Sequence, residues 1–446
     1  MALTGLEIYK QLPKTNCKDC GFPTCLAFAM KMAAGQVPLE KCPHVTDEAK
    51  AALESASRPP IQLVTIGTED AEIKIGNETQ LYRHEEKFYR PAAVAVKISD
   101  TLDQGAVAQQ AEAAGQLKFE RVGTEIRVNL VAVVNESGDA AKFEQAATLA
   151  AEKSGLACVL MADTAANLAK AAGALSGKRP LLYISDPAEA EAAAAVAKDN
   201  DCPLAVKAEG VEALAELTPK VTAAGVEELV LDPGTRTLKD TLEALTLIRR
   251  ASLKGCRELG YPMIAFTTAE DPTLQAVEAS TFIAKYAGVV VSEGAEKWQM
   301  LPVLTTRQDI YIDPQKPVAV EPRLNAIGEV DENSPLLVTT NFSLSYYSVE
   351  GEVEASRVPA YILSVDTEGT SVLTAWASDK FNPETITQAM KKSGIEEKVS
   401  HRKLVIPGFV AVLSAGVEDE SGWSVQIGPK EASGIPSYLK NQWQAS

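Results

Sequence analysis

The chain contains 446 residues, of which 46% are hydrophobic and 23% charged, so it is long enough for two or three globular domains. Its net charge of −17 argues against nucleic acid or an anionic membrane as the main partner, because both attract basic proteins. No apolar run approaches the roughly 18 residues of a membrane helix, and the first residues do not resemble a secretory signal. We therefore expect a cytoplasmic protein with no membrane partner.

Four of the seven cysteines lie near the start of the chain. Cys17, Cys20, Cys25 and Cys42 follow the spacing C-x2-C-x4-C-x16-C. In a reducing compartment, clustered cysteines bind metal more often than they form disulfides. Three crowded cysteines and a fourth that precedes a proline are typical of an iron-sulfur cluster. We predict that these four residues hold a [4Fe-4S] cluster in a small domain, residues 1–57.

A structural zinc site is the alternative for the same four cysteines. Such sites usually consist of two short cysteine pairs separated by a longer stretch, which differs from the spacing here. The remaining cysteines lie in apolar or helical segments and are interpreted as small buried hydrophobic residues. They are Cys158, Cys202 and Cys256.

Residues 58–320 alternate short β-branched runs with alanine-rich helical segments. Runs such as "IRVNLVAVVN", "ACVLMAD" and "GVVVSEGAE" lack polar alternation, which indicates strands of a parallel sheet covered on both faces. About seven or eight such units recur, and this number favours a (β/α)8 TIM barrel over an open sheet.

Polar residues follow several of the predicted barrel strands. They are Asn135, Glu136, Asp163, Asp186, Asp232 and Glu293. Active sites of barrels occupy this carboxyl end, so an acidic enzyme site is one interpretation. Capping of the following helices is the other, and we favour it because no nucleophile-base pair is recognisable among these residues.

Residues 321–446 form a third region. Four strand-like runs, "SPLLVTTN", "PAYILSVD", "RKLVIP" and "GWSVQIG", each precede a loop of small or hydroxyl residues. This pattern predicts a small Rossmann-like α/β domain whose ligand lies across the carboxyl ends of its strands. The loop at Gly369 adds the hydroxyls of Thr370, Ser371 and Thr374 and the start of a helix. A nucleotide is not favoured, because no G-x-G-x-x-G fingerprint occurs.

The order of these parts resembles the large (gamma) subunits of the corrinoid iron-sulfur proteins of the reductive acetyl-CoA pathway. The resemblance covers the whole chain and is most specific in "NCKDCGFPTC" and "VDTEGTSVLTAWAS". It implies an α/β chain with an N-terminal small [4Fe-4S] domain, a central TIM barrel and a C-terminal Rossmann-like corrinoid-binding domain.

The resemblance implies a methyl carrier rather than a stand-alone enzyme. The cobalt of a cobamide, as Co(I), would take a methyl group from methyltetrahydrofolate on a separate methyltransferase and deliver it to CO dehydrogenase/acetyl-CoA synthase. The cluster would pass electrons from a low-potential donor to return Co(II) to Co(I), which suits the very negative potentials that such clusters reach. A small TIM-barrel subunit would complete a heterodimer and cover the cobamide.

The cobamide is expected to be base-off, without a protein histidine as cobalt ligand. Many cobalamin proteins carry a D-x-H-x-x-G motif for that ligand, and this sequence has none. The three histidines are His44, His84 and His401, and His401 precedes a strand instead of following one.

The resemblance and the strand ends together predict the cobamide contacts. They are Thr340, Asn341, Phe342, Tyr346, Gly369, Thr370, Ser371, Val372, Leu373, Thr374, Gly408, Phe409, Val410, Ala411, Ala415, Gly416, Ser433 and Gly434. A turn or a helix cap is the alternative role for each. No residue is predicted to be catalytic, because the cobalt itself is the nucleophile.

Two other functions stay open. One is an iron-sulfur TIM-barrel methyltransferase that acts directly on a pterin substrate. The other is an electron-transfer adaptor whose barrel serves only for docking.

Overall fold

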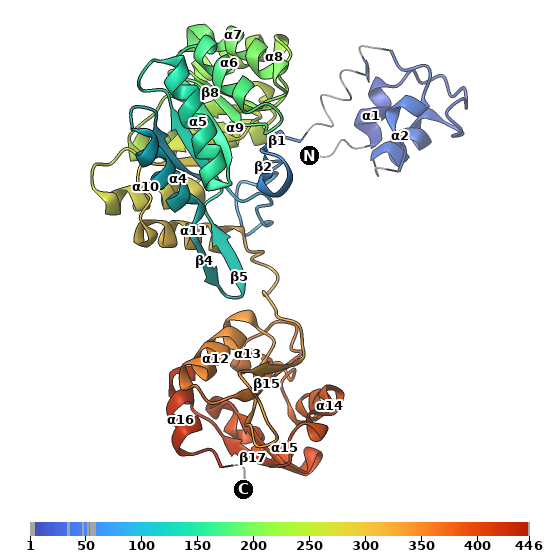
Figure 1. The fold of residues 1–446 in the computed structure, drawn as a ribbon. Coiled ribbons are helices and arrows are strands. Elements are labelled where there is room, and N and C mark those ends of the chain that lie inside the picture. Colours follow the sequence, from blue (N-terminus) through green and yellow to red (C-terminus); the bar gives the residue numbers. More distant parts are fainter. Residues whose placement is uncertain (1–4, 34–35, 47–48, 51–52, 54–58, 445–446) are drawn as a thin grey trace. The chain divides into compact units, whose positions relative to one another are not determined.

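The computed structural model describes residues 5–33, 36–46, 49–50, 53 and 59–444 (Figure 1). The chain divides into two compact units. One comprises Met1–Phe119 and Ile126–Tyr311, and the other comprises Glu120–Glu125 and Ile312–Ser446. Among the described residues, no helix has both the length and the apolar character needed to cross a bilayer.

The cysteine segment folds around two short helices, α1 (Gly5–Gln11) and α2 (Cys25–Ala33), and a 3-10 turn at Leu39–Lys41. Its small core combines apolar side chains with three of the four cysteines. The buried members are Ile8, Leu12, Cys20, Cys25, Phe28, Ala29, Leu39, Cys42 and Leu53. Because so few apolar residues are available, a metal centre would supply much of the stability of a domain this small.

Eight parallel strands form a closed barrel in the order β10-β11-β12-β3-β6-β7-β8-β9, which confirms the predicted TIM-like barrel. The strands are β3 (Ala93–Ser99), β6 (Leu130–Val134), β7 (Ala157–Ala162), β8 (Leu181–Ile184), β9 (Leu204–Lys207), β10 (Leu229–Asp232), β11 (Met263–Phe266) and β12 (Ala287–Ser292). The helices that follow them in turn are α4 (Gln104–Gly115), α5 (Ala140–Ser154), α6 (Ala165–Ala174), α7 (Ala190–Asp199), α8 (Val211–Ala223), α9 (Leu238–Leu253), α10 (Pro272–Ala284) and α11 (Lys297–Tyr311).

Five of the eight barrel helices begin at side-chain caps. Asp103, Asp139, Thr164, Thr237 and Asp271 each accept a hydrogen bond from a backbone N–H of the first helical turn. These bonds satisfy N–H groups that have no partner within the helix.

Two hairpins accompany the barrel, and the tip of the second, Glu120–Glu125, belongs to the other unit. The first, β1 (Leu63–Ile66) with β2 (Ile73–Gly76), packs Val64, Ile66 and Ile75 against residues that open the barrel strands, among them Ala93 and Leu130. It therefore closes the amino end of the barrel interior and leaves the carboxyl end to the βα loops. The second hairpin consists of β4 (Lys118–Arg121) and β5 (Thr124–Arg127).

The second unit is built on a five-stranded sheet in the order β13-β15-β14-β16-β17. The strands are β13 (Leu324–Ile327), β14 (Leu336–Thr340), β15 (Ala360–Val365), β16 (Lys403–Ile406) and β17 (Ser424–Ile427), and only β13 runs antiparallel to its neighbour. The helices are α12 (Ser343–Ser356), α13 (Val372–Ala377), α14 (Pro383–Ser393), α15 (Ser414–Ser421) and α16 (Ile435–Asn441).

Helices cover both faces of this sheet. On one face, Leu336 and Val338 pack with Ile386 of α14 and Val417 of α15. On the other face, Leu337 packs with residues of α12 and α16. Neighbouring residues of β14 therefore point into different cores, as the two-residue period of a strand requires.

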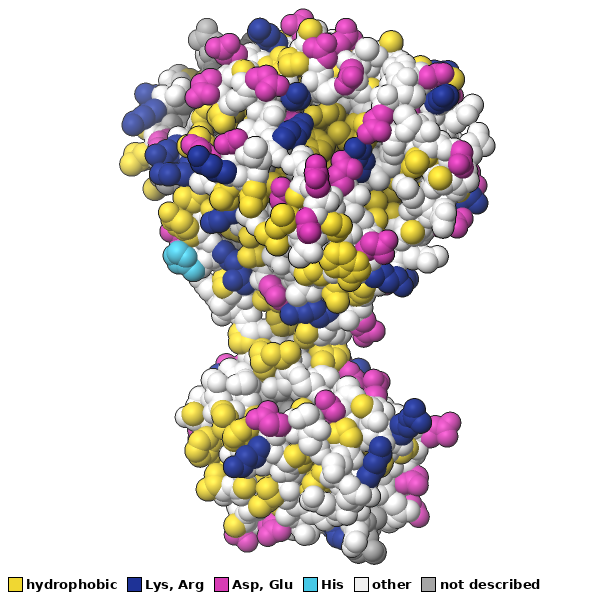
Figure 2. Space-filling model, turned by 90° about the vertical axis from the view of Figure 1, so that its left-hand side faces the viewer, with side chains coloured by type: hydrophobic (Ala, Val, Ile, Leu, Met, Phe, Trp, Pro, Cys, Tyr) yellow, Lys and Arg dark blue, Asp and Glu magenta, His cyan; other side chains and the backbone are white. Residues whose placement is uncertain are grey.

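Charges on the molecular surface are mixed. On the face drawn in Figure 2, acidic side chains lie among basic and apolar ones. The described residues of that face form no broad basic area of the kind that binds a nucleic acid backbone.

Candidate metal centre and cofactor-binding site

The loop that carries the first three cysteines is bent tightly. Asn16, Lys18 and Gly21 all have positive φ angles, and the N–H of Gly21 donates to the carbonyl of Lys18 at 2.8 Å. The side-chain oxygen of Asn16 accepts from the N–H of Cys25 at 2.8 Å, which fixes the start of α2. This left-handed backbone turns the chain back on itself, so cysteines close in sequence can face a common centre.

The four cysteines share one electrostatic environment. Cys20, Cys25 and Cys42 are buried and Cys17 is exposed. Burial raises the pKa of the Cys42 thiol, and the nearby Cys20, Cys25 and Cys17 raise it further. Thiols that repel one another in this way are stabilised as thiolates by a bound metal centre, so the residues fit a four-cysteine cluster.

A second pair of polar residues lies at the edge of this site. The ring nitrogen Nε2 of His44 lies 2.6 Å from Oδ2 of Asp19. The pKa of the Asp19 carboxyl is lowered by its bond to His44 and by a further bond to Cys17. Asp19 and His44 therefore connect Cys17 to the segment that carries Cys42.

The strand order of the second unit creates a switch point. The chain passes from β14 to β15 on one side and then to β16 on the other side of β14. β14 and β16, which flank this reversal, are paired in parallel at Leu337 and Val405. In open parallel sheets, ligands bind in the crevice that such a reversal leaves at the carboxyl ends of the strands.

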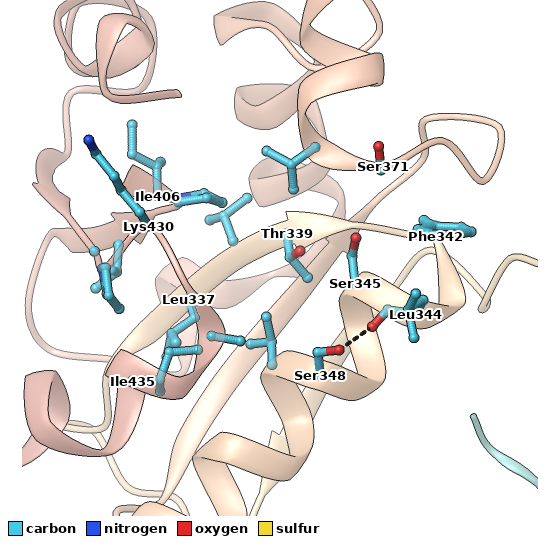
Figure 3. A pocket seen from close by; sticks show the side chains of 18 residues that line it. Leu337, Thr339, Phe342, Leu344, Ser345, Ser348, Ser371, Ile406, Lys430 and Ile435 are labelled. Carbon is cyan, nitrogen blue, oxygen red and sulfur yellow. Dashed lines mark hydrogen bonds between the residues drawn. The ribbon is translucent and has the colours of Figure 1, made fainter. Parts of the chain in front are cut away.

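A pocket of about 360 Å³ occupies this position (Figure 3). Apolar side chains make up most of its wall, and the hydroxyls of Thr339, Ser345 and Ser371 and the amine of Lys430 add polar groups. Its lining residues are Leu337, Val338, Thr339, Phe342, Leu344, Ser345, Ser348, Val349, Ser371, Val372, Val405, Ile406, Pro407, Gly428, Pro429, Lys430, Ala432 and Ile435. An apolar cleft with a few polar groups is the usual form of a small-molecule site.

Asn341 organises the loop beside the pocket. Its Oδ1 accepts hydrogen bonds from the backbone N–H groups of Thr367 (2.9 Å) and Gly369 (3.0 Å) and from the Thr367 hydroxyl (3.0 Å). Gly369 has a φ of +72°, and a Cβ there would lie 3.0 Å from Ala319 and from Pro317. The loop before α13 is therefore held by buried hydrogen bonds. Position 369 favours glycine, because a side chain there would crowd its neighbours and strain the backbone.

The structure brings part of the predicted contact set together. Phe342, Ser371 and Val372 line the pocket directly. Leu373 and Phe409 are each 47% exposed. Leu373 lies in the first turn of α13, and Phe409 lies near the start of the 3-10 segment after β16. Thr340 ends β14 and its buried hydroxyl has no hydrogen-bond partner among the described residues. Ser371 and Thr374 bond to each other through their hydroxyls at 3.0 Å.

Most of the other predicted contacts take part in packing or hydrogen bonds within the second unit. Tyr346 is buried in the α12–α16 core, and its hydroxyl donates to Glu350 at 2.9 Å. Thr370 bonds back to the carbonyl of Thr367, and Val410 is buried in the α14–α15 core. A Cβ on Gly416 would lie 2.7 Å from Pro383, and one on Gly434 would lie 2.7 Å from Pro429. Ala415 and Ser433 are exposed, and Gly408 and Ala411 belong to the 3-10 segment after β16.

The prediction missed several pocket residues that lie within strands. Leu337 and Thr339 of β14 and Val405 of β16 line the pocket, although the prediction placed contacts only after the strands. Lys430 was missed too. Alternation along β14 could have indicated that Leu337 and Thr339 share a face, but only the strand order of the sheet places that face beside Val405 of β16.

No described histidine is among the residues that line the pocket. Nε2 of His401 lies 2.9 Å from the carbonyl of Ser334, and Nδ1 accepts from the N–H of Lys403 at 3.2 Å. His401 also packs edge-on against Trp423 and Trp443. Both ring nitrogens are thus occupied at the amino end of the sheet. His44 lies in the cysteine segment, and His84 stacks on Tyr82.

The polar residues at the barrel rim are mostly not helix caps. Asp186 does cap a 3-10 turn, by accepting from the N–H of Ala188. Glu136 and Glu293 bind Lys97 at 3.0 and 2.8 Å, and Asp232 binds Arg236. Asn135 donates to Asp100, and Asp163 accepts from Ser185. The cap interpretation is therefore wrong for these five, because their side chains bond to polar groups at the barrel rim while Asp139, Thr164 and Thr237 cap the helices α5, α6 and α9.

Of the three remaining cysteines, Cys158 and Cys202 are buried, as expected, and Cys256 is half-buried. Burial raises the pKa of the Cys158 thiol to about 12 and that of Cys202 to about 11. Neither thiol is disposed to react or to bind metal.

The chain is thus an α/β protein with two candidate cofactor sites, a segment with four cysteines and a pocket at a strand-order reversal. The chain belongs to the family described as CO dehydrogenase/acetyl-CoA synthase delta subunit, whose model matches residues 63–439. A second family model, for an Fe-S cluster, matches residues 12–44 and thus includes all four cysteines. These matches confirm the predicted N-terminal Fe-S domain and the family resemblance.

Curated relatives extend over the whole chain. The corrinoid/iron-sulfur protein large subunit of Moorella thermoacetica is 47% identical over 99% of both chains. The acetyl-CoA decarbonylase/synthase complex subunit gamma of Methanothermobacter thermautotrophicus is 36% identical over 98% of this chain and 99% of its own length. A solved dihydropteroate synthase from Vibrio fischeri covers 50% of this chain at 13% identity, with a TM-score of 0.40.

Proposed function

We propose that the chain is the large subunit of a corrinoid iron-sulfur protein and carries methyl groups in the acetyl-CoA pathway. The observation that supports this most is the combination of a full-length relative of that name with two separate sites in this chain, a four-cysteine centre and an open pocket. A methyl carrier needs the pocket to hold the methyl-bearing cofactor and the cysteine centre to keep that cofactor reduced.

The cobamide would bind in the proposed domain 321–446, at the carboxyl edge of the sheet. A cobamide supplies, when bound, a cobalt nucleophile that can take and give a methyl group. The chain contributes the binding surface. The apolar pocket between β14 and β16 suits the aromatic lower base, and the loop held by Asn341 would border the corrin ring.

The base-off state is supported by the positions of the histidines. Because both nitrogens of His401 are engaged away from the pocket, no described histidine of this domain is available beneath the cobalt. A cobamide held in this domain without a histidine ligand would be easier to reduce to Co(I). This would make the resting cofactor accessible to a low-potential cluster.

The four cysteines would hold a [4Fe-4S] cluster that returns oxidised cobalt to the active state. Partners would be a small TIM-barrel subunit, a methyltetrahydrofolate methyltransferase, CO dehydrogenase/acetyl-CoA synthase and a low-potential electron donor. The relatives are named as subunits, which agrees with a heterodimer.

Cofactor analysis of the chain purified with its small subunit tests this proposal. We expect four irons and one cobalt per heterodimer, and methylation of the cobalt by methyltetrahydrofolate only when the methyltransferase is present. Iron without cobalt would favour the electron-transfer adaptor. Demethylation of a methylated pterin by the chain without any partner would favour the barrel methyltransferase.

A further inference from the structure

A second pocket lies at the carboxyl end of the barrel and is not used by the proposed carrier function. It has a volume of about 260 Å³. Residues in or just after seven of the eight strands line it, with β9 as the exception among the described strands. They are Lys97, Val134, Asn135, Met161, Ala162, Asp163, Tyr183, Ser185, Arg236, Phe266, Thr267, Thr268, Val291 and Glu293. This is the end at which TIM barrels bind their ligands.

One wall of this pocket is a flat, fixed guanidinium. Nη1 and Nη2 of Arg236 donate to the two oxygens of Asp232 at 3.0 and 2.8 Å, and Asp232 is 1% exposed. Nη2 also lies 3.2 Å from the hydroxyl of Tyr183, and Nη1 donates to the carbonyl of Thr235 at 2.7 Å. These bonds occupy the terminal N–H groups of Arg236 and hold the group in one plane.

The guanidinium of Arg236 lies over an aromatic ring and is partly open to solvent. Its carbon lies 4.4 Å from the centre of the Phe266 ring, while 36% of the side chain stays exposed. The ring of Tyr183 meets Phe266 edge-on at 5.5 Å. A flat aromatic ring can stack on the exposed part of such a guanidinium, which leaves the pocket wall suited to a planar ligand.

The edge of the pocket offers acceptors rather than cations. Lys97 is neutralised by Glu136 and Glu293, and Arg236 by Asp232. Among the described contacts, Asp163 receives one hydrogen bond, from Ser185 to Oδ1, so Oδ2 can accept from a ligand. Glu293 likewise binds Lys97 through Oε1. A phosphate or carboxylate ligand would meet no free cation here and would be repelled by these carboxylates.

We propose that the carboxyl end of the barrel binds a small, uncharged, planar heterocycle with N–H donors on its edge. The ring would stack on Arg236, and its N–H groups would donate to Asp163 and Glu293. The volume is below the roughly 300–1,000 Å³ of pockets for larger ligands, so one ring system fits. Pterins and guanines share this chemistry. The site needs neither the cluster nor the corrinoid.

Calorimetric titration of the purified full-length chain, with its cofactors, tests the proposal. The probes are pterin, guanine and benzoate, the last being planar but anionic and without N–H donors. We expect pterin or guanine, or both, to bind and benzoate not to bind. Asp163→Asn replaces an acceptor with a donor, and losing a charge-assisted hydrogen bond should weaken binding about tenfold or more.

Glu191→Gln is the matched control, because Glu191 is an exposed carboxylate on α7 outside the pocket. It should bind the probes as the unmodified chain does. No binding of pterin and guanine at millimolar concentration would overturn the proposal. Equal binding of benzoate, unchanged affinity in Asp163→Asn, or an equal loss in Glu191→Gln would also overturn it.

Discussion

The side-chain oxygen of Asn341 accepts a 3.0 Å hydrogen bond from the backbone N–H of Gly369, and this bond ties the end of β14 to the loop after β15. The same oxygen accepts from Thr367. All three residues are buried. The border of the C-terminal pocket thus depends on one amide that lies just beyond the last residue of β14.

Asn341→Ala should loosen this border. It leaves the N–H groups of Thr367 and Gly369 buried without an acceptor, which should cost about 2–4 kcal/mol of the free energy of unfolding. We expect a lower urea midpoint for the C-terminal unit and a reduced cobalt content per chain. Asn333→Ala, at an exposed position of the same unit, is the control and should stay within about 0.5 kcal/mol. Full cobalt retention in the Asn341 variant would show that the loop does not border the cofactor.

Ser345→Phe should block the pocket between β14 and β16. Ser345 lies on α12 and its side chain points into the pocket (Figure 3). A phenyl ring there would take up space needed by a bound ligand, so cobalt content should fall several-fold while iron content stays unchanged. Ala355→Phe adds the same ring at an exposed position of the same helix and should not change cobalt content. Normal cobalt in both variants would exclude this pocket as the cofactor site.

Cys20→Ser should remove the cluster and spare methyl delivery. Cys20 is one of the four cysteines of the proposed centre, whereas the proposed cofactor pocket lies in a different unit. A variant that starts with a methylated cofactor should therefore deliver its methyl group, and should fail to recover after oxidation. Iron analysis and repeated turnover measure the two effects, with Cys202→Ser as a control that keeps its iron. Loss of methyl delivery in the first turnover would contradict the reactivation role.

The barrel and the cysteine centre could be predicted from sequence because their signals are local. Strands such as β7 are apolar at every position, since both faces are covered, and the cysteine spacing requires no knowledge of the fold. The Asp232–Arg236 pair could not be predicted. Its arginine lies in the loop after β10, and only the closed barrel brings both residues against Tyr183 and Phe266.

The lining of the proposed cofactor pocket was predicted only in part for a related reason. Loops after strands can be read from the sequence, which led to Phe342 and Ser371. The pocket floor depends on the pairing of β14 with β16, which lie far apart in the sequence. The hydrogen bond between Asn341 and Thr367 could not be predicted from sequence either, because it joins segments that are far apart in the chain. The burial of the Thr340 hydroxyl likewise depends on the fold.

Alkylation should distinguish the two buried barrel thiols from the cluster cysteines. Burial raises the pKa of Cys202 to about 11, so about one thiol in a thousand is thiolate at pH 8, and fewer at Cys158 with its pKa of about 12. Iodoacetamide at pH 8 should leave both unlabelled in the folded chain. Iron removal should expose the four N-terminal cysteines to the reagent, and mass spectrometry of the labelled peptides measures this.

The raised pKa values of Cys158 and Cys202 also make the free energy of unfolding depend on pH. The ordinary thiol value is 9.0 for both residues, so the unfolded chain loses these protons before the folded chain does. Stability should therefore decrease as pH rises above about 9. Cys158→Ala and Cys202→Ala should reduce that slope. Rapid labelling of Cys158 or Cys202 at pH 8 without unfolding would contradict the burial on which both expectations rest.

Arg249→Met should destabilise the barrel through Glu78. Arg249 donates to the carbonyl of Gln80 at 3.0 and 2.7 Å, lies over the rings of Phe88 and Tyr286, and its Nη2 is 3.5 Å from Glu78. Burial raises the pKa of the Glu78 carboxyl, and Arg249 is the cation that opposes this rise. Without the arginine, Glu78 is a buried charge with no cation, at a cost of about 3–5 kcal/mol.

The pH dependence and a double variant identify the cause. A carboxyl whose folded pKa is raised is stabilised by protonation, so the defect of Arg249→Met should be smaller at pH 5 than at pH 8. Adding Glu78→Gln removes the charge and should restore part of the loss, because the amide oxygen can still accept from Tyr89 and Arg90. Arg250→Met, at the exposed neighbouring position, is the control. Urea unfolding measures all four proteins, and a defect that is independent of both pH and Glu78 would mean that lost packing against Phe88 and Tyr286 is the cause.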